Sequence, residues 1–514
     1  MGSYHVLAKK ERPIRVRPCL GVRGKERQSI GCGRKDLRDP MRWGLPPEAV
    51  AQVGERLYTF WQRFRSCFRT RTRDGSQHAY HYLQGQLTMD RKRNFANIAR
   101  KTTGKDGQAL QHFMSNSPWS ARGVFRQIQS EIKATPALAQ GGILILDESA
   151  DNKAGVHNAG ASRQYNGRLG KVDVCRVDTC LTYFHPKTGV QVIVDGELFL
   201  PEEWFQPEVA QLREELGIPK GRKFETKIAL GLKMVKRAKA NELPFDLMAC
   251  DALYGRDGQF RATLDAEGIV YAAEVPEHTQ VYLREPKVAI PRKRSRYGRP
   301  RTRLQVVSRE SPQEVRALAR SPTTQWHHVR VRHTERGWLE GDFAVVRIWT
   351  VHKGGMPRPE WLVMRRDADG DHTFTLLNAP HWTPREYLIE WSCQRYFVER
   401  TFEDAKSELG WDEFQAQKYR AWEHHLALTA LALWFIAQIK LEWAQLYKRD
   451  PELARQLEVE VLPVLSTANV RELLKATLPL PQLTPQEAIA LVIEHLINRA
   501  RSTSSRLKTS PRVS

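Results

Sequence analysis

Two short apolar runs in the middle of the chain each end on a carboxylate. Residues 143–146 (Ile-Leu-Ile-Leu) follow a glycine pair and lead into Asp147, and residues 244–250 (Pro-Phe-Asp-Leu-Met-Ala-Cys) lead into Asp251. Runs of this length that are bounded by glycine or proline are typical of buried strands rather than helices. The pattern therefore predicts two buried strands, each followed by an aspartate.

Strands and helices alternate around these two runs. Residues 174–184 and 190–200 have strand patterns joined by the turn His-Pro-Lys-Thr-Gly, and with residues 143–146 they predict a three-stranded antiparallel meander. The elements expected after the meander are two helices and a strand, at residues 225–243, 258–267 and 269–275. This alternation predicts an α/β core in which helices pack on a sheet.

The rest of the chain divides by its pattern. Residues 46–140 contain short amphipathic helices with basic faces, which predict either a DNA-binding module or an ordinary helical bundle. Residues 278–383 have strand patterns separated by turn clusters, and the chain becomes helical again from residue 384. The predicted parts are a flexible basic arm (1–45), a helical DNA-binding domain (46–140), the first part of the α/β core (141–277), a β-rich insertion domain (278–383), the second part of the core (384–440), a helical C-terminal region (441–498) and a disordered basic tail (499–514).

A third carboxylate lies on the helix predicted around residues 391–411. At about 100° per residue, Arg395, Glu399 and Lys406 share one face of this helix. The apolar stripe of the helix borders that face, so Glu399 is expected at the edge of the core. The face could hold a metal ion and phosphates, or it could be an ordinary ladder of surface salt bridges. The side chains expected to point to solvent are Arg400, Asp404 and Glu408.

The net charge of the chain indicates which class of molecule the protein binds. The 514 residues carry a formal net charge of +23, which favours a polyanion such as nucleic acid, with an anionic membrane surface as the competing partner. The longest apolar stretch, residues 426–439, is too short to span a bilayer, and the first residues lack an apolar core for export. Seven scattered cysteines and the histidine spacing indicate neither disulfides nor zinc. We expect a soluble cytoplasmic protein.

The order of the three acids carries a resemblance to a known family. With Asp147, Asp251 and Glu399 in this order and a β-rich segment between the second and third, the chain resembles DDE-type bacterial insertion-sequence transposases. More narrowly, it resembles the seven-oh-one branch of the insertion-sequence-four-like group. Stretches similar to that branch run from about residue 82 to residue 425.

The signature of that group is a Tyr, an Arg, a Glu and a Lys on the helix of the third acid. Arg395, Glu399 and Lys406 match it at the expected steps. Ser392 stands where the signature has tyrosine, which puts the role of that tyrosine in doubt here but not the metal site.

The resemblance implies a ribonuclease H-like core and a DNA transposase. Such an enzyme cleaves phosphodiester bonds at the ends of an insertion sequence and joins the freed 3′-OH ends to target DNA. It implies catalysis by two divalent ions, for which Mg²⁺ suits carboxylate ligands and Mn²⁺ is a substitute. The expected ligands are Asp147 for both ions, Asp251 for one and Glu399 for the other. No small-molecule cofactor is expected.

The expected DNA contacts extend beyond the acids. Arg395 and Lys406 would hold phosphates near the cut, and Tyr396 would either stack on an unpaired base or pack in the protein. The other basic residues expected at DNA are Arg163 in a glycine-rich loop, and Arg294, Arg296, Arg299 and Arg301 in a basic loop of the insertion. The expected partners are double-stranded DNA, at transposon ends and target sites, and a second copy of the chain on paired ends, in association with the bacterial nucleoid and not with a membrane.

Other functions and other acids compete with this interpretation. A DNA-binding protein with an inactive nuclease core would not cut, and a nuclease on the same fold would cut without joining. A protein of the membrane surface is disfavoured because the positive charge is spread over several domains. The competing acids are Asp151, Asp178, Asp195, Asp246 and Glu403; of these, Asp178 and Asp195 are expected at most to support the metal ligands.

Overall fold

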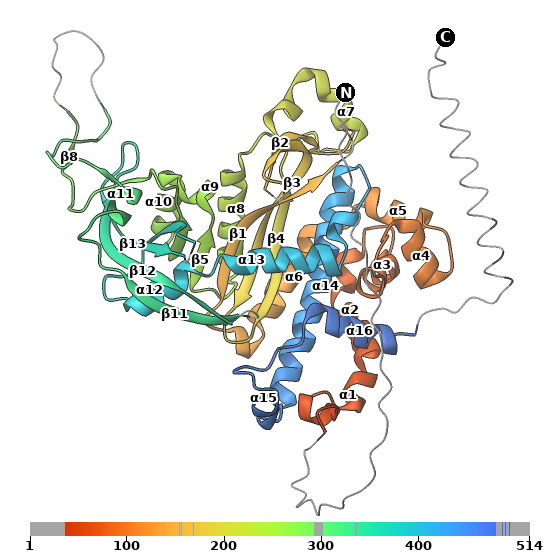
Figure 1. The fold of residues 1–514 in the computed structure, drawn as a ribbon. Coiled ribbons are helices and arrows are strands. Elements are labelled where there is room, and N and C mark those ends of the chain that lie inside the picture. The colour runs from red at the N-terminus through yellow and green to blue at the C-terminus, as the bar shows by residue number, and fades with distance from the viewer. Residues whose placement is uncertain are drawn as a thin grey trace, which may run out of the picture. The chain divides into compact units, whose positions relative to one another are not determined.

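The computed structural model describes residues 36–479, apart from 154, 156, 168, 292–301, 335–336 and 368, together with residues 486, 489 and 493. Contacts between residues separate 1–39 from 40–514, and every element below belongs to the second unit (Figure 1). Arg294, Arg296, Arg299 and Arg301 of the predicted basic loop lie outside the described residues.

A ten-stranded mixed sheet organises residues 40–514 (Figure 1). Its order is β11-β12-β13-β14-β6-β5-β1-β3-β2, and β4 pairs with β3. Its strands are β1 (Ile143–Asn152), β2 (Ser162–Asn166), β3 (Lys171–His185), β4 (Val190–Leu198), β5 (Leu247–Cys250), β6 (Tyr271–Glu274), β11 (His327–Thr334), β12 (Gly337–Thr350), β13 (Arg358–Arg366) and β14 (His372–Leu377). Two small sheets pair β7 (Gln280–Val281) with β10 (Gln313–Glu314) and β8 (Val288–Ala289) with β9 (Gln305–Val306).

The sheet changes from antiparallel to parallel at β1. Strand β3 runs antiparallel to both β1 and β4, which agrees with the predicted meander, whereas β5 is parallel to β1 and β6 is parallel to β5. Two details differ from the expected pattern. Strand β1 continues to Asn152 because β3 pairs with its whole length, and the loop expected at residues 159–171 contains β2, which also pairs with β3.

The β-rich segment predicted at residues 278–383 extends the same sheet. Strands β11 to β14 form an antiparallel meander, and β14 pairs antiparallel with β6. Helix α11 (Val315–Ala319) and the inner side chains of these strands bury a separate apolar cluster.

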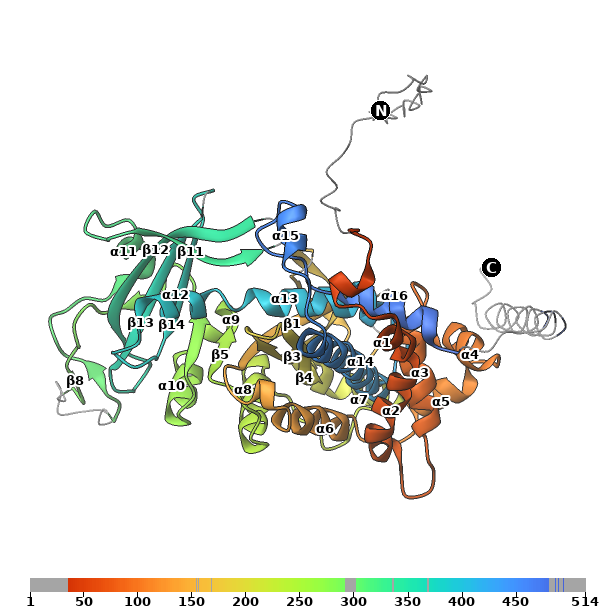
Figure 2. The ribbon, with the colours of Figure 1, turned by 90° about the horizontal axis from the view of Figure 1, so that it is seen from below.

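Helices cover both faces of the central strands. Figure 2 shows α13 on one side of β1 and β3, and α6 and α8 on the other. Helix α8 approaches β1 closely, since a Cβ atom at Gly231 would lie 2.4 Å from the side chain of Leu146. The α-helices other than α11 are α1 (Pro47–Ala51), α2 (Val53–Phe64), α3 (Ser76–Thr88), α4 (Phe95–Thr103), α5 (Gln108–Ser115), α6 (Ala121–Lys133), α7 (Ala210–Glu215), α8 (Lys227–Ala240), α9 (Ala252–Gly255), α10 (Gly258–Ala266), α12 (Arg385–Ser392), α13 (Tyr396–Glu403), α14 (Tyr419–Leu446), α15 (Glu452–Gln456) and α16 (Thr467–Thr477).

The amino-terminal helices share their core with α14. Apolar residues of α2, α3, α5, α6 and α14 belong to one buried cluster with the central strands. Tyr82 of α3 bonds to the buried His425 of α14, and His424 bonds to the backbone carbonyls of Met114 and Trp119. Helix α14 is long and apolar enough to cross a membrane, but 83% of its most apolar 18-residue window is buried in the structure, as in the core helix of a soluble protein.

The helix predicted around residues 391–411 is broken, which corrects two expectations. Helix α12 ends at Ser392, α13 begins at Tyr396, and residues Asp404–Glu408 form a π-helical turn. The π turn shifts the angular positions that follow it. Asp404, the first residue of this turn, is buried because Thr467 and Gln191 cover it, and it accepts a hydrogen bond from each. Glu408, the last residue of the turn, pairs with Arg471, so neither acid points to solvent.

Candidate active site

Three carboxylates lie side by side on three parallel strands, at the level where β5 and β6 end. The register pairs Leu146 of β1 with Cys250 of β5, and Cys250 with Ala273 of β6. The next residues are Asp147, Asp251 and Glu274. Neighbouring strands are about 4.8 Å apart, so this shared register places the three acids in a row.

Each of the two aspartates is fixed by its local backbone. Asp147 accepts a hydrogen bond from the backbone N–H of Glu148 at 2.7 Å. Asp251 precedes α9 and caps it, with one carboxylate oxygen 3.0 Å from the backbone nitrogen of Leu253. Both carboxylates are thus held at the sheet edge by backbone donors.

Helix α13 brings the third predicted acid and a guanidinium to this row. Arg395, directly before α13, donates to Glu274 at 3.0 Å, to Asp147 at 3.1 Å and to Glu399 at 2.7 Å. The Glu399 side chain keeps 54% of its surface exposed. One guanidinium therefore links three carboxylates from β1, β6 and α13.

The pKa values record the concentration of negative charge. Burial and the charge of Asp251 raise the pKa of Asp147 to about 7, although Arg395 opposes the shift. Burial and the charge of Glu148 raise the pKa of Asp251 to about 6. Burial works against the positive charge of Arg395, yet Glu274, Asp147 and Glu399 together raise its pKa above the usual range.

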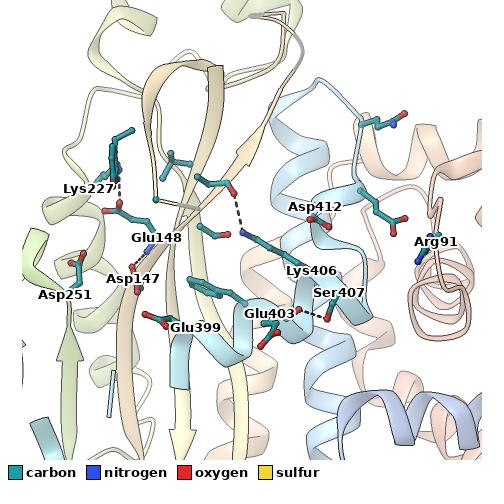
Figure 3. A pocket seen from close by; sticks show the side chains of 18 of the residues that line it. Arg91, Asp147, Glu148, Lys227, Asp251, Glu399, Glu403, Lys406, Ser407 and Asp412 are labelled. Carbon is teal, nitrogen blue, oxygen red and sulfur yellow. Dashed lines mark hydrogen bonds and ion pairs between the residues drawn. The ribbon is translucent and has the colours of Figure 1, made fainter. Parts of the chain in front are cut away.

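A cavity of about 1300 Å³ opens over Asp147, Asp251 and Glu399. Figure 3 shows Asp147, Asp251 and Glu148 at one side of it and Arg91 at the other, with Lys406 between them in this view. The lining residues that carry charge are Asp90, Arg91, Lys92, Asp147, Glu148, Lys227, Asp251, Glu399, Glu403, Lys406, Asp412 and Glu413.

The acids suit a hard divalent cation by their chemistry. Carboxylate oxygens are the ligands that Mg²⁺ prefers, and the mutual repulsion of Asp147 and Asp251 is relieved by a cation. Among the described residues, no three His, Cys, Asp or Glu side chains are close enough together to hold one metal ion. In this conformation Arg395 supplies the positive charge that lies between Asp147 and Glu399.

The predicted DNA-binding residues are placed differently from one another. Lys406 lines the cavity and donates to the carbonyl of Ala150, whereas Arg395 is engaged with the carboxylates. Tyr396 is half exposed, and the guanidinium of Arg332 lies 4.8 Å from its ring centre. Arg163 is exposed on β2, and its neighbour Tyr165, not Arg163 itself, lines the cavity.

Most of the competing acids are engaged elsewhere. Asp195 is buried between Arg122 and Arg237, and Asp178 is buried beside Arg176. The others are Asp151, which pairs with Lys153, and Asp246, which accepts from the backbone of Gly141. Glu403 lines the cavity but pairs with Arg400.

The sequence analysis did not identify Glu274, and it did not identify the polar cluster of Glu148, Tyr254 and Lys227 near Asp251. Glu274 stands at the end of the strand predicted at residues 269–275. The pattern that indicated the two aspartates, a buried strand that ends on an acid, therefore also indicates Glu274. Glu148 accepts hydrogen bonds from Tyr254 at 3.1 Å and from Lys227 at 2.8 Å. These three residues are far apart in sequence, and no local pattern joins them.

Three comparisons relate the chain to known proteins. A family model described as DDE superfamily endonuclease matches residues 63–337, a range that includes Asp147 and Asp251 and ends before Glu399. The probable transposase for insertion sequence element IS701 of Microchaete diplosiphon is 26% identical over 343 residues, which are 66% of this chain and 77% of that protein. A cryo-EM structure of the piggyBac transposase synaptic complex with hairpin DNA covers 87% of this chain and 84% of its own, at 10% identity and a TM-score of 0.33.

The first two comparisons confirm the resemblance that the motifs predicted. The family model spans more than half of the sequence and includes the strands that carry both aspartates. The chain therefore belongs to the DDE superfamily of endonucleases.

Proposed function

We propose that this DDE transposase binds the ends of an insertion sequence, cleaves phosphodiester bonds there with Asp147, Asp251 and Glu399, and joins the freed 3′-OH ends to target DNA. The observation that carries the proposal is the pair of aspartates at neighbouring positions of the parallel strands β1 and β5, which lines one cavity of about 1300 Å³ together with Glu399. The strands β4-β3-β1-β5-β6 are the part of the sheet that we assign to a ribonuclease H-like core.

The proposed cofactor is a pair of Mg²⁺ ions, or Mn²⁺ in their place. Bound at these acids, they would supply Lewis acidity and a water of lowered pKa. Asp147 lies next to Asp251 on the neighbouring strand and is linked through Arg395 to Glu399, so it would be shared by both ions, while Asp251 and Glu399 would each hold one. The backbone donors to Asp147 and Asp251 orient these carboxylates before any ligand arrives.

Arg395 has a second partner in this proposal. A guanidinium binds phosphate oxygens with the same two-pronged geometry that it uses for carboxylates. With cations at the acids, Asp147 and Glu399 would no longer need the charge of Arg395, which would then be able to bind a backbone phosphate beside the cut. Lys406, on the cavity wall, would place a second positive charge beside the same DNA strand.

The partners follow from the reaction and from the charge of the chain. We assign double-stranded DNA as the substrate, two copies of the chain on paired ends as the working unit, and the bacterial cytoplasm as its place of action. The formal net charge of +23 supports binding to a polyanion.

The test is a nicking and joining assay on DNA that carries the terminal inverted repeat of the element, with Mg²⁺ or Mn²⁺. Asp147→Asn, Asp251→Asn and Glu399→Gln should each lose several kcal/mol of transition-state stabilisation, which is a rate loss on the order of 10²-fold or more, and should keep DNA binding. Glu403→Gln is the matched control: it removes an acid of the same helix and cavity that pairs with Arg400, and it should retain activity.

Three outcomes would contradict parts of the proposal. A dead Glu403→Gln with an active Glu399→Gln would assign the third acid to Glu403. Cutting without joining would make the protein a nuclease of the same family. Binding without any cutting by the wild type would make it a DNA-binding protein.

A further inference from the structure

The turn between α3 and α4 forms the wall of the cavity that lies away from the catalytic acids. Asp90, Arg91, Lys92 and Asn94 of this turn line the same cavity as Asp147 and the other acids. Arg91 and Lys92 are both exposed. The amino-terminal helical region thus presents two adjacent cationic side chains to the cavity, and Figure 3 shows Arg91 on the side opposite Asp147 and Asp251.

Two buried arginines hold this turn in place. Arg93 has 1% of its side chain exposed; it donates to Glu413 at 2.9 Å and to the carbonyl of Glu408 at 2.6 Å. Arg471 of α16 donates to the carbonyl of Met89 at 2.6 Å and to the carboxylate of Glu408 at 2.5 Å. The turn is therefore fixed on both sides to the π-helical turn that carries Lys406.

The backbone is specialised for this arrangement. Lys92 has φ of +58°, in the left-handed region that side chains other than glycine seldom adopt. Gly410, at φ +67°, gives Arg93 its space, because a Cβ atom there would lie 2.7 Å from the Arg93 side chain.

The acids around the turn are already neutralised. Asp90 pairs with Arg471 and Lys475, Glu413 pairs with Arg93, and Glu403 pairs with Arg400. In the part of the chain that the structure describes, neither Arg91 nor Lys92 has an ion-pair partner; the structure records ion pairs for the acids beside them instead. Their two charges are available to an anion in the cavity.

We propose that Arg91 and Lys92 form a phosphate-binding site for the DNA strand whose scissile phosphate lies at the acids. Arginine can bind a phosphate with two parallel hydrogen bonds, and lysine acts on it as a point charge. The cavity exceeds the roughly 300–1,000 Å³ of a typical small-molecule pocket, which fits several nucleotides of a strand. Lys406 would contact the backbone between the two ends of the cavity.

This inference rests on the proposed function, because it takes the scissile strand to lie at Asp147. It adds that the amino-terminal region holds the strand inside the catalytic cavity, in addition to any contact that it makes with the duplex outside. Contacts to phosphates are independent of sequence, so a duplex of arbitrary sequence suffices as a first probe.

The test measures the salt dependence of DNA binding by the full chain in chelator, without catalysis. Each phosphate contact contributes about 0.9 to the slope of log K against log salt concentration, so Arg91→Ser/Lys92→Ser should reduce the slope by about 1.8. The matched control is Lys220→Ser/Lys223→Ser, which removes the same charge from exposed positions outside both the cavity lining and the predicted DNA-binding domain. That control should keep the wild-type slope, and so should the charge-conserving Arg91→Lys/Lys92→Arg.

A second measurement locates the contact on the strand. Methylphosphonates that neutralise single phosphates near the cleavage position of end DNA should weaken binding by the wild type and leave Arg91→Ser/Lys92→Ser unaffected at the same positions. An unchanged slope in the double variant, or an equal loss in the Lys220/Lys223 control, would overturn the inference. If the wild type binds but does not cut end DNA, the proposed function fails, and if it cuts while the double variant keeps its slope, only the inference fails.

Discussion

Asp147 is held between two opposite influences, a guanidinium that stabilises its charge and a second aspartate that destabilises it. Burial and Asp251 outweigh Arg395, so its pKa rises to about 7, and that of Asp251 rises to about 6. Since the two carboxylates interact, they titrate as a pair. Both pKa values lie above the value of about 3.9 for an unfolded aspartate.

The sign of these shifts predicts how the stability of the metal-free protein depends on pH. The folded state keeps protons that the unfolded state has lost, so the contribution of this pair to stability is present below pH about 4 and is lost as pH rises to about 7. In chelator, the melting temperature of the wild type should therefore fall more steeply over this range than that of Asp147→Asn, which cannot titrate. Thermal unfolding monitored by circular dichroism checks it, and parallel curves for the two proteins would refute it.

At the residue scale, the two aspartates could be predicted from the sequence, because a buried strand that ends on an acid is a local pattern. Glu274 follows the same pattern and could have been included. The role of Arg395 as the partner of three carboxylates could not be predicted, because it depends on how α13 lies across β1 and β6. That placement is a property of the tertiary packing.

Among the elements, the region around α13 departs most from a regular pattern. A helical wheel assumes 100° per residue, and this assumption fails at the break before Tyr396 and at the π turn Asp404–Glu408. For a different reason the wheel also placed Asp404 in solvent: α16 covers that face of the helix, and Asp404 is buried against Thr467 at 2.6 Å. The order and type of the central strands and helices were predictable, since their periodicity is local.

The contact of Asp404 with Thr467 leads to a prediction of stability. Thr467→Val keeps the shape of the side chain and removes the hydroxyl donor, so a buried carboxylate loses a hydrogen bond, which should cost about 1–3 kcal/mol of unfolding free energy. The matched control is Thr59→Val, at an exposed position of α2 where the hydroxyl bonds only to the backbone of its own helix. Urea unfolding measures both, and equal losses would show that the contact with Asp404 contributes little.

The whole molecule places the amino-terminal helices and α14 in one core. Residues 46–140 are predicted to bind DNA, and their apolar faces pack against α14, where Gln86 donates to Thr429, 343 residues later. Domain boundaries predicted from composition do not reveal this contact, because the segments that pack together are far apart in the sequence.

This shared core predicts how fragments behave. A fragment of residues 46–140 alone should melt at lower temperature and with less cooperativity than the same fragment joined by a flexible linker to residues 419–446, because α14 supplies apolar surface that the fragment lacks. Circular dichroism measures the transition, and salt-dependent binding of end DNA should accompany the folded form. Cooperative melting of the shorter fragment at the same temperature would show that the region is self-sufficient.

The pairing of β14 with β6 has a consequence for the solubility of the protein. Without residues 278–383, β6 would be the last strand of the sheet, and its unpaired N–H and C=O groups would form an open edge beside buried strands. Such edges recruit strands from other molecules and promote aggregation. The segment between the second and third acids thus protects the catalytic half of the sheet from self-association, and copies of the element that lose it by internal deletion would yield insoluble chains.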